Sequence, residues 1–482
     1  MTDTKFSSRR GAVFVQPNGA NSRPQVLRCV DSDALSSPKR SKELIKCWNP
    51  YGDGWLDVGM TYSPPGPSTV TLTELTDASL SALEKIYCPV TLLFAQIKNG
   101  KLTQINNAER VMIMKNAEPT EDSYDNLVHH SDDNVSTHGV PFSGDSDVVV
   151  VGQSTALRQT TTETQSLNDI HGNTKAICDD KVNPGDYLIA AADAAAAEAN
   201  VLYSRDGGST WEAAAAEPFA ATESIMSCQW FQVDNETERW LVGMEAPAAD
   251  QGMVAYSDDL GATWVTVNVG GAAAGHGSAL GGTLHVVDAT EIWLASAAGY
   301  IYKSIDGGEA WTAMEQGDLT TDDYNHIHMR GKRGVAVSDN GVVALTQDGG
   351  DNWYAGTVVT GTPDLLCCWM TDPNTIWIGD DDGDLWYSED FGTTWTERTG
   401  LTGAPTEIRD IEFFDTQVGF FAMDNVTPEG TIQQTILGGY SWRTVPTAGN
   451  SGINAVHVVN QNLAFAVGEA DGALAFIAKI AA

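Results

Sequence analysis

The stretch Ser304–Trp311 constrains the fold of this chain more than any other, because the chain repeats its pattern. It has the form Ser-x-Asp-x-Gly-x-x-Trp, and four further stretches keep this frame, one of them with Thr in place of Ser. A sixth copy, ending at Trp442, has lost the Asp. The residues at the Asp position lie 53, 47, 42, 42 and 47 apart along the chain. A period of about 40–50 residues indicates an array of repeated supersecondary units.

We call this pattern the box, and we expect its residues to be structural. Each box lies between two short apolar runs, which predicts a strand, a tight turn and a second strand. The Asp can accept hydrogen bonds from turn amides, the Gly supplies a positive φ, and the Trp can fold back as an apolar plug. The predicted structural residues are Ser204, Asp206, Gly208, Trp211, Ser257, Asp259, Gly261, Trp264, Ser304, Asp306, Gly308, Trp311, Thr346, Asp348, Gly350, Trp353, Ser388, Asp390, Gly392, Trp395, Gly439 and Trp442.

Two further strand signals precede each box, as at 283–287 and 291–296 in one unit. Four short strands per repeat are the unit of a β-propeller blade. We count seven units, beginning near residues 176, 223, 278, 324, 364, 407 and 452. The last unit has no box and no fourth strand, so we expect the Thr-rich stretch 157–165 to supply one. Such a closure would remove an exposed sheet edge.

These units resemble the Asp-box (bacterial neuraminidase) repeat. The layout of seven units is similar to that of photosystem II assembly-factor propellers and sortilin-type propellers. The resemblance implies a seven-bladed β-propeller over residues 153–482, in a chain that is mainly β. It does not select a function, because such boxes lie at the periphery of propellers in sialidases, lectins, receptors and assembly factors alike.

The region before the propeller shows a different pattern. A Thr-rich strand is predicted at 68–75, one helix at 77–87, and a hairpin turn at Asn99-Gly100. We therefore expect an N-terminal arm at 1–45 and a small β-sandwich-like domain with one helix at 46–152. The polar stretch 116–146 is predicted to be an exposed acidic loop of that domain.

This arrangement resembles the major tail (tail tube) protein of long-tailed bacteriophages, on the evidence of residues 66–75, 77–87 and the turn at Asn99-Gly100. The resemblance implies a virion structural protein that forms homo-oligomeric rings or tubes with copies of itself and contacts other virion proteins. The propeller would then face outward, where it could contact a glycan or a host surface. The alternative is a soluble adhesion or assembly module whose propeller binds a protein or glycan partner.

Composition limits the partners and the compartment. The chain carries 27 Lys+Arg against 64 Asp+Glu, and residues 176–482 hold 11 and 44 of these. This acidity argues against binding to a nucleic-acid backbone. The sequence has no apolar run near 18 residues and no apolar signal segment at its start, and its seven cysteines include no Cys-x-x-Cys. We expect reduced thiols and a virion protein made in the host cytoplasm, without a signal peptide or membrane span.

No enzymatic constellation is expected. Sialidase chemistry needs a cluster of arginines that binds a carboxylate, but Arg205, Arg398 and Arg443 lie in boxes or directly after them. The sequence shows no nucleophile–base pair and no phosphate-binding loop. We therefore predict a protein that is not an enzyme, that needs no cofactor, and whose function lies in its surfaces.

Two stretches could suggest a metal, and for both we favour the structural interpretation. The acidic run 380–384 resembles a calcium loop, but its Gly stands at the wrong position and the distal Glu is missing. We predict a hairpin turn there. His326 and His328 lie on one predicted strand and are expected to be ordinary polar residues, and Cys367-Cys368 are expected in the core. No metal site is predicted.

Overall fold

The computed structural model describes the backbone of nine strands before residue 153. It describes residues 154–481 except 160–164, 174–182, 194–199, 220–223, 235–236, 245–252, 270–283, 297–298, 315–322, 400, 402–404, 426–429, 448–451 and 472–473. The chain divides into two compact units, Met1–Gln153 and Ser154–Ala482. Among the described residues, no helix has the length and apolar character needed to cross a membrane.

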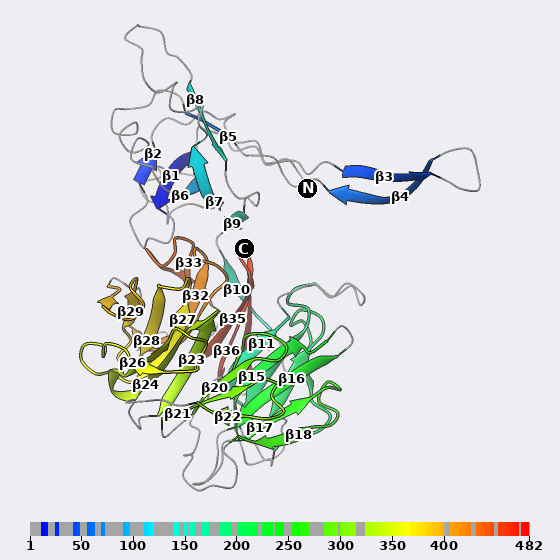
Figure 1. Cartoon of the computed structure of the whole chain (residues 1–482), viewed down its shortest axis with the longest axis vertical. Coiled ribbons are helices and arrows are strands. Elements are labelled where there is room, and N and C mark those ends of the chain that lie inside the picture. Colours follow the sequence, from blue (N-terminus) through cyan, green and yellow to red (C-terminus); the bar gives the residue numbers. More distant parts are fainter. Residues whose placement is uncertain are drawn as a thin grey trace. The chain divides into compact units, whose positions relative to one another are not determined.

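The first unit is built from antiparallel strands (Figure 1). One seven-stranded sheet has the order β2-β1-β6-β7-β8-β5, with β9 paired to β7, and a separate hairpin joins β3 to β4. The strands are β1 (Gly11–Pro17), β2 (Gln25–Leu27), β3 (Lys42–Trp48), β4 (Trp55–Tyr62), β5 (Thr69–Leu72), β6 (Val90–Gln96), β7 (Arg110–Pro119), β8 (His138–Ser143) and β9 (Val149–Gly152).

Strand β1 lies within the expected arm 1–45 and pairs along its whole length with β6. One stretch of the first unit differs from the sequence expectation. Strand β8 falls in the stretch 116–146, which we expected to be a loop, and it pairs with β5. Its sequence, His-Gly-Val-Pro-Phe-Ser, includes Val and Phe, which favour strands, and the acidic residues around it concealed this signal. The predicted helix at 77–87 and the predicted turn at Asn99-Gly100 lie outside the described residues.

The second unit is a seven-bladed β-propeller, as predicted (Figure 1). Its sheets each have four antiparallel strands, and contacts between neighbouring inner strands run from blade 1 through blade 7 and back to blade 1. The first three blades are blade 1, β11 (Leu167–Gly172), β12 (Leu188–Ala192), β13 (Val201–Ser204) and β14 (Glu212–Ala213); blade 2, β15 (Ile225–Gln232), β16 (Glu238–Met244), β17 (Met253–Ser257) and β18 (Val265–Asn268); and blade 3, β19 (Leu284–Val286), β20 (Ile292–Ser296), β21 (Tyr300–Ser304) and β22 (Thr312–Ala313). The next three are blade 4, β23 (Tyr324–Arg330), β24 (Arg333–Ser338), β25 (Val343–Thr346) and β26 (Tyr354–Ala355); blade 5, β27 (Leu365–Met370), β28 (Ile376–Asp380), β29 (Leu385–Ser388) and β30 (Thr396–Glu397); and blade 6, β31 (Pro405–Phe413), β32 (Gly419–Asn425), β33 (Gly430–Thr435) and β34 (Arg443–Val445). Blade 7 consists of β35 (Ile453–Asn460), β36 (Leu463–Asp471), β37 (Leu474–Ala481) and the upstream strand β10 (Thr155–Arg158).

Ring closure by an upstream strand is confirmed, although the strand is shorter than predicted and lies slightly earlier. Strand β10 pairs antiparallel with β37, from Thr155 opposite Ala481 to Arg158 opposite Ala478. Blade 1 begins at Leu167 rather than near residue 176. Its inner strand has the sequence Leu-Asn-Asp-Ile-His-Gly, and these polar residues hid the strand from a search for apolar runs.

The box turns are organised by one hydroxyl and one carboxylate each. In the third box, Ser304 Oγ donates to Asp306 Oδ1 at 2.8 Å and accepts from the Gly308 amide at 2.9 Å. Asp306 Oδ1 also accepts from the Ala310 amide at 2.9 Å. The four other boxes that keep the Asp repeat these bonds. In the sixth, which lacks the Asp, Thr435 Oγ1 still accepts the Gly439 amide at 3.0 Å.

The box glycines are contact points between blades. A methyl group on Gly350 of blade 4 would lie 1.9 Å from Trp293 of blade 3, and one on Gly439 of blade 6 would lie 2.2 Å from Trp377 of blade 5. These second-strand tryptophans are 0 % and 1 % exposed. Most box tryptophans, Trp311 among them, are only half-buried. The box tryptophans pack against buried core residues, as the sequence suggested, but the second-strand tryptophans Trp293 and Trp377 are more deeply buried than most of them.

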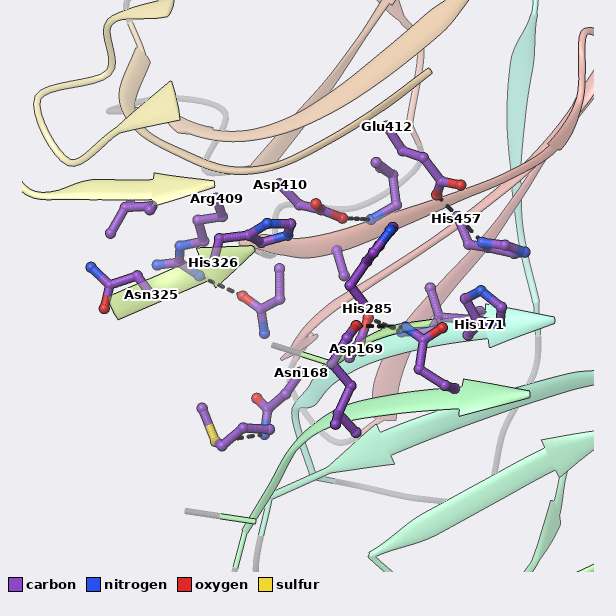
Figure 2. Close-up of a pocket in the computed structure, with 18 of the residues that line it drawn as sticks. Asn168, Asp169, His171, His285, Asn325, His326, Arg409, Asp410, Glu412 and His457 are labelled. Carbon is purple, nitrogen blue, oxygen red and sulfur yellow. Dashed lines mark hydrogen bonds and ion pairs between the residues drawn. The ribbon is translucent and has the colours of Figure 1, made fainter. Parts of the chain in front are cut away.

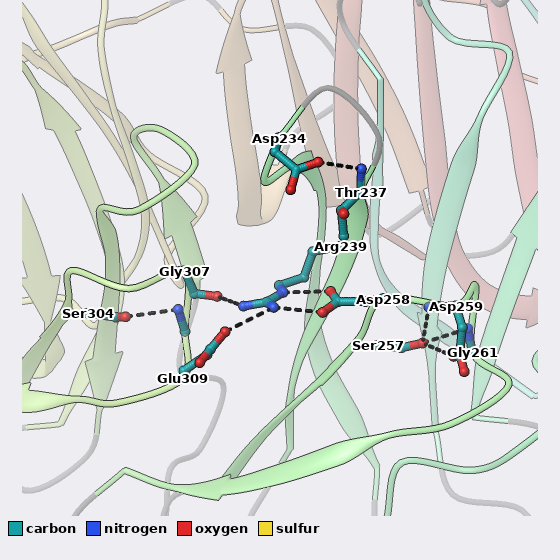
Figure 3. Close-up of polar contacts among 11 residues, drawn as sticks. Asp234, Thr237, Arg239, Ser257, Asp258, Asp259, Gly261, Ser304, Gly307 and Glu309 are labelled. Atoms are coloured by element: carbon teal, nitrogen blue, oxygen red, sulfur yellow. Dashed lines mark hydrogen bonds and ion pairs between the residues drawn. The ribbon is translucent and has the colours of Figure 1, made fainter. Parts of the chain in front are cut away.

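A buried guanidinium adds a polar link between blades 2 and 3 (Figure 3). Arg239 is 4 % exposed, and its two nitrogens donate to both carboxylate oxygens of Asp258 at 2.7 Å. It also donates to the Gly307 carbonyl at 2.9 Å and to Glu309 at 3.2 Å in the third box turn. Two bonds to one carboxylate fix the orientation of the guanidinium.

Candidate binding site in the axle of the propeller

The inner strands of all seven blades surround a central cavity of ≈ 540 Å³ (Figure 2). Two neighbouring cavities, of ≈ 490 Å³ and ≈ 360 Å³, share lining residues with it. The first of these adjoins the ends of the inner strands, around Gly172, and the second adjoins their beginnings, around Ser166. The three cavities therefore follow one another along the central axis of the propeller, which we call its axle. We call the three cavities together the axial channel.

A β-bulge recurs at the same place in six of the inner strands. There the pairing with the second strand passes over one residue, for example between Leu167 and Asp169 in blade 1. A bulged residue has no partner across the ladder, and its side chain is re-aimed. The six residues bulged at this place all line the central cavity, whereas Thr406 and Val459, at second register shifts in β31 and β35, are not part of its described lining. The six are Asn168, Met226, Asn325, Leu366, Arg409 and Asn454.

The three bulged asparagines join consecutive blades. Asn168, Asn325 and Asn454 each donate a side-chain hydrogen bond to the carbonyl of the first residue in an adjacent inner strand, at 3.0, 3.0 and 2.8 Å. An inner strand is the edge of its sheet, so its outward-facing backbone groups need partners from elsewhere. The polar side chains along the central axis therefore have a structural role.

Two carboxyl groups occupy equivalent positions next to the bulges of blades 1 and 6. Asp169 accepts from the amides of Ile170 and Cys228, both at 2.8 Å. Asp410 accepts from the amide of the following residue and from Val456 in blade 7, also at 2.8 Å. Burial raises the pKa of Asp169 to about 6 even though these amide bonds lower it. Burial likewise raises the pKa of Asp410 well above its ordinary value.

Imidazoles make up much of the remaining wall, and burial keeps them neutral. It lowers the pKa of His285 to about 4, that of His326 to about 3, and that of His171 well below its ordinary value. His171 Nδ1 accepts the Trp230 amide at 3.2 Å, which places its proton on Nε2. His285 Nε2 lies 3.1 Å from the Met329 carbonyl, so its proton is also on Nε2.

One ring nitrogen of His457 lies beside a carboxylate, and the other has no hydrogen-bond partner among the described residues. Its Nδ1 lies 3.3 Å from Glu412 Oε2, which also accepts the Val458 amide at 2.9 Å. The ring is 1 % exposed and lies 4.4 Å from the ring of His171. Its Nε2 is buried and has no hydrogen-bond partner among the described residues. Such an atom in the wall of a cavity suits a ligand that supplies a hydrogen bond.

Arg409 is the positively charged residue in the wall of the central cavity, and carboxylates already pair with its guanidinium. Its guanidinium lies 2.9 Å from Glu407, 2.7 Å from Asp424 and 3.2 Å from Glu469. Three carboxylates surround one positive charge, and Asp410 lies next to it in sequence. This side of the axial channel therefore keeps a negative character.

This convergence was not predicted from the sequence. His326 and His328 were expected to be ordinary polar residues, and their place near the central cavity was not foreseen. His326 lines the central cavity with its Nδ1 3.5 Å from Cys368 Sγ, and His328 is 4 % exposed between the rings of His285 and Trp369. That the function lies in the surfaces of the protein stays a prediction. The recurrence of Asn as the second residue of the inner strand in three repeats was the available signal.

The structure does not bring the box residues together. They lie on turns between the third and fourth strands of their blades, and the axial channel is lined by other residues. The acidic run 380–384 forms the turn between β28 and β29, as predicted. In the described part of the chain, no group of three or more His, Cys, Asp or Glu side chains is placed to hold a metal ion.

Comparisons with known proteins agree with the fold. No family model matches the chain. A xyloglucanase from a Paenibacillus species is 31% identical over 154 residues, which are 30% of this chain and 14% of that protein. The chain thus spans about a seventh of the length of this relative.

Among solved structures, YCF48 from Cyanidioschyzon merolae superposes with a TM-score of 0.50 at 16% identity, over 67% of this chain and 98% of that one. A xyloglucanase from Xanthomonas campestris superposes with a TM-score of 0.48 at 12% identity, over 66% and 53%. At such identities the likeness to YCF48 establishes a propeller fold and nothing finer. The tail-tube resemblance of residues 46–152 gains no support from these similarities.

Proposed function

We propose that the propeller is a non-enzymatic binding module that holds an extended segment of a protein partner in the axial channel. The observation that carries this proposal is the convergence of side chains from seven inner strands on contiguous cavities, six of them aimed by a bulge. Concave sites with a few convergent polar groups are where proteins bind ligands.

Binding is favoured over catalysis because the buried carboxyl groups already serve as hydrogen-bond acceptors within the fold. Asp169 and Asp410 each use both carboxylate oxygens for backbone amides, and one of these amides belongs to another blade. Groups that join blades are better suited to define a surface than to move during a reaction.

A protein segment is favoured over a glycan by the shape and lining of the channel. The three cavities form a row, which suits an extended chain. The inner strands are sheet edges, and edge backbone groups are the partners that extended peptides commonly use. Glycan sites commonly present aromatic platforms, whereas the described lining of the central cavity has Trp369 as its one aromatic side chain besides histidine, and Trp230 and Phe231 line only the adjoining cavity around Gly172.

The test is a binding screen with a matched pair of variants. Full-length protein is screened against a displayed library of random peptides and against a glycan array. Leu366→Trp adds bulk at a bulged, half-buried position of the channel, and Ile305→Trp makes a comparable change at a box residue that is 74% exposed. Peptides selected by the wild type should lose about tenfold or more in affinity for Leu366→Trp and keep it for Ile305→Trp. Equal binding by both folded variants, or capture of glycans alone, would contradict the proposal.

A virion role remains a prediction of the sequence pattern. In that case residues 46–152 would form rings or tubes and the propeller would decorate their outside. Electron microscopy of the purified chain tests this directly, because tubes or rings would be visible at high protein concentration. Particles of single-chain size at every concentration would speak against it.

A further inference from the structure

We propose that the axial channel recognises a lysine or arginine side chain of the bound segment. This inference rests on the proposed binding function of the channel. One side of the channel is acidic and the other is apolar, and the acidic side presents hydrogen-bond acceptors. A basic side chain has a cationic head that only donates hydrogen bonds and an apolar stem, so it matches both sides.

The acidic side is formed by blades 6, 7 and 1, which are consecutive around the ring. It carries Asp410 and Glu412 from β31 and Asp169 from β11. Arg409 does not neutralise them, because Glu407, Asp424 and Glu469 surround its guanidinium. A cation that enters the central cavity therefore meets a wall that carries three carboxyl groups (Figure 2).

The apolar side is formed by blades 3, 4 and 5, across the ring from the acidic side. Its half-buried apolar lining residues are Val286 from β19 and Leu366 and Trp369 from β27, and they lie beside the polar side chains of His285, Asn325 and His326. The methylene stem of a lysine or arginine can lie along such a surface while its head remains among polar groups. The indole face of Trp369 also attracts a cation.

His457 provides an independent indication that the ligand donates hydrogen bonds. The contact of its Nδ1 with Glu412 Oε2 places the ring proton on Nδ1. Its Nε2 is then an acceptor, and it has no donor among the described residues. An ammonium or guanidinium group offers only donors, so it complements this nitrogen and the carboxylates together.

The ionisable groups around Asp169 give the proposal a definite pH dependence. They are His171 on its own strand, Cys228 on β15, His285 on β19, Arg409, Asp410 and Glu412 on β31, and His457 on β35. Burial raises the pKa of the Asp169 carboxyl to about 6, and a nearby cation would lower it again. Binding therefore releases protons and weakens as the pH falls. Protonation of His171 or His285 at low pH would add positive charge and act in the same direction.

The experiment compares two pentapeptides by calorimetry with the full chain. The first is acetyl-Gly-Gly-Arg-Gly-Gly-amide, and the second carries citrulline, a neutral isostere of arginine. The arginine peptide should bind about tenfold more tightly at pH 7.5, as expected for a charge-assisted hydrogen bond. Its affinity should fall several-fold at pH 5.0, and two buffers of different ionisation enthalpy should reveal proton release. Equal binding of the two peptides would refute the proposal.

Matched variants separate the channel from general attraction to an acidic protein. Glu412→Gln keeps an oxygen for the Val458 amide and removes one charge from the channel, whereas Glu397→Gln removes one charge from the outer strand β30. The first should weaken the arginine peptide by about fivefold or more and the second by less than about twofold. Equal losses would show non-specific attraction and overturn the proposal. If neutral peptides bind and are blocked by Leu366→Trp, the binding function stands and only the preference for a cation fails.

Discussion

Adding a single methyl group to Gly350 tests the packing between blades. Gly350 has a φ of +85°, and a Cβ there would lie 1.9 Å from one ring carbon of Trp293 and 2.7 Å from two others. Gly350→Ala therefore incurs a left-handed backbone cost of about 1–2 kcal/mol. It also incurs an overpacking cost of about 1–3 kcal/mol, because Trp293 is 0 % exposed and cannot move aside freely. The expected loss in the free energy of unfolding is about 2–5 kcal/mol.

The preceding residue provides the control. Gly349 has a φ of +86°, but no atom lies within 4 Å of the position that its Cβ would occupy. Gly349→Ala should cost only the backbone contribution of about 1–2 kcal/mol. Urea denaturation followed by circular dichroism measures both variants. The reasoning fails if the two lose equal stability, or if Gly350→Ala is as damaging in a Trp293→Leu background, where the opposing ring is absent.

Three further predictions concern stability and can be followed by the same denaturation experiment. Trp293→Ala should lower the free energy of unfolding by about 3–5 kcal/mol. Trp311→Ala should lower it by only about 1–2 kcal/mol, because the ring of Trp311 is half-buried. Equal losses would show that burial does not separate the two classes of tryptophan. Arg239→Met should lower the free energy of unfolding by about 1–3 kcal/mol. The loss stays moderate because Asp258 and Glu309 are exposed enough to be hydrated when the guanidinium is absent. An unchanged stability would mean that the link between blades 2 and 3 does not stabilise the fold. Burial raises the pKa of Asp380 to about 6, so its contribution favours folding below pH 4 and is lost as the pH rises through 6. The unfolding free energy of Asp380→Asn should therefore depend less on pH between 4 and 7, by up to about 3 kcal/mol, and an unchanged slope would contradict this assignment.

The repeat could be predicted because its signal lies within short stretches of sequence. A box needs a hydroxyl, a carboxylate and a glycine within five residues, and the bonds of Ser304, Asp306 and Gly308 show why this spacing recurs. Closure by β10 could be inferred for a similar reason, since a three-stranded last blade implies a strand from elsewhere. The fold of the second unit could thus be predicted from local sequence patterns and from the number of repeats and strands.

The axle could not be predicted in the same way, because it depends on contacts between blades. Asp169 and Cys228 are 59 residues apart, and Asn454 bonds to a residue 287 positions away. A single repeat shows these side chains only as polar residues in a strand. The relative importance of Trp293 and Trp311 was also hidden, because both belong to strand–turn–strand patterns and only the packing of blade on blade separates them.

The recurrent bulge has a consequence for how such a ring could change over evolutionary time. A side chain in a regular ladder position packs within its own blade, so a substitution there disturbs the fold. The six bulged residues stand outside the ladder of their own blade, and Asn, Met, Leu and Arg already occupy equivalent positions. The three asparagines still bond to neighbouring blades and Arg409 pairs with three carboxylates, whereas the side chains of Met226 and Leu366 donate no such bond. A lineage could therefore exchange what the ring recognises at Met226 and Leu366 while the bonds that hold the ring together stay the same.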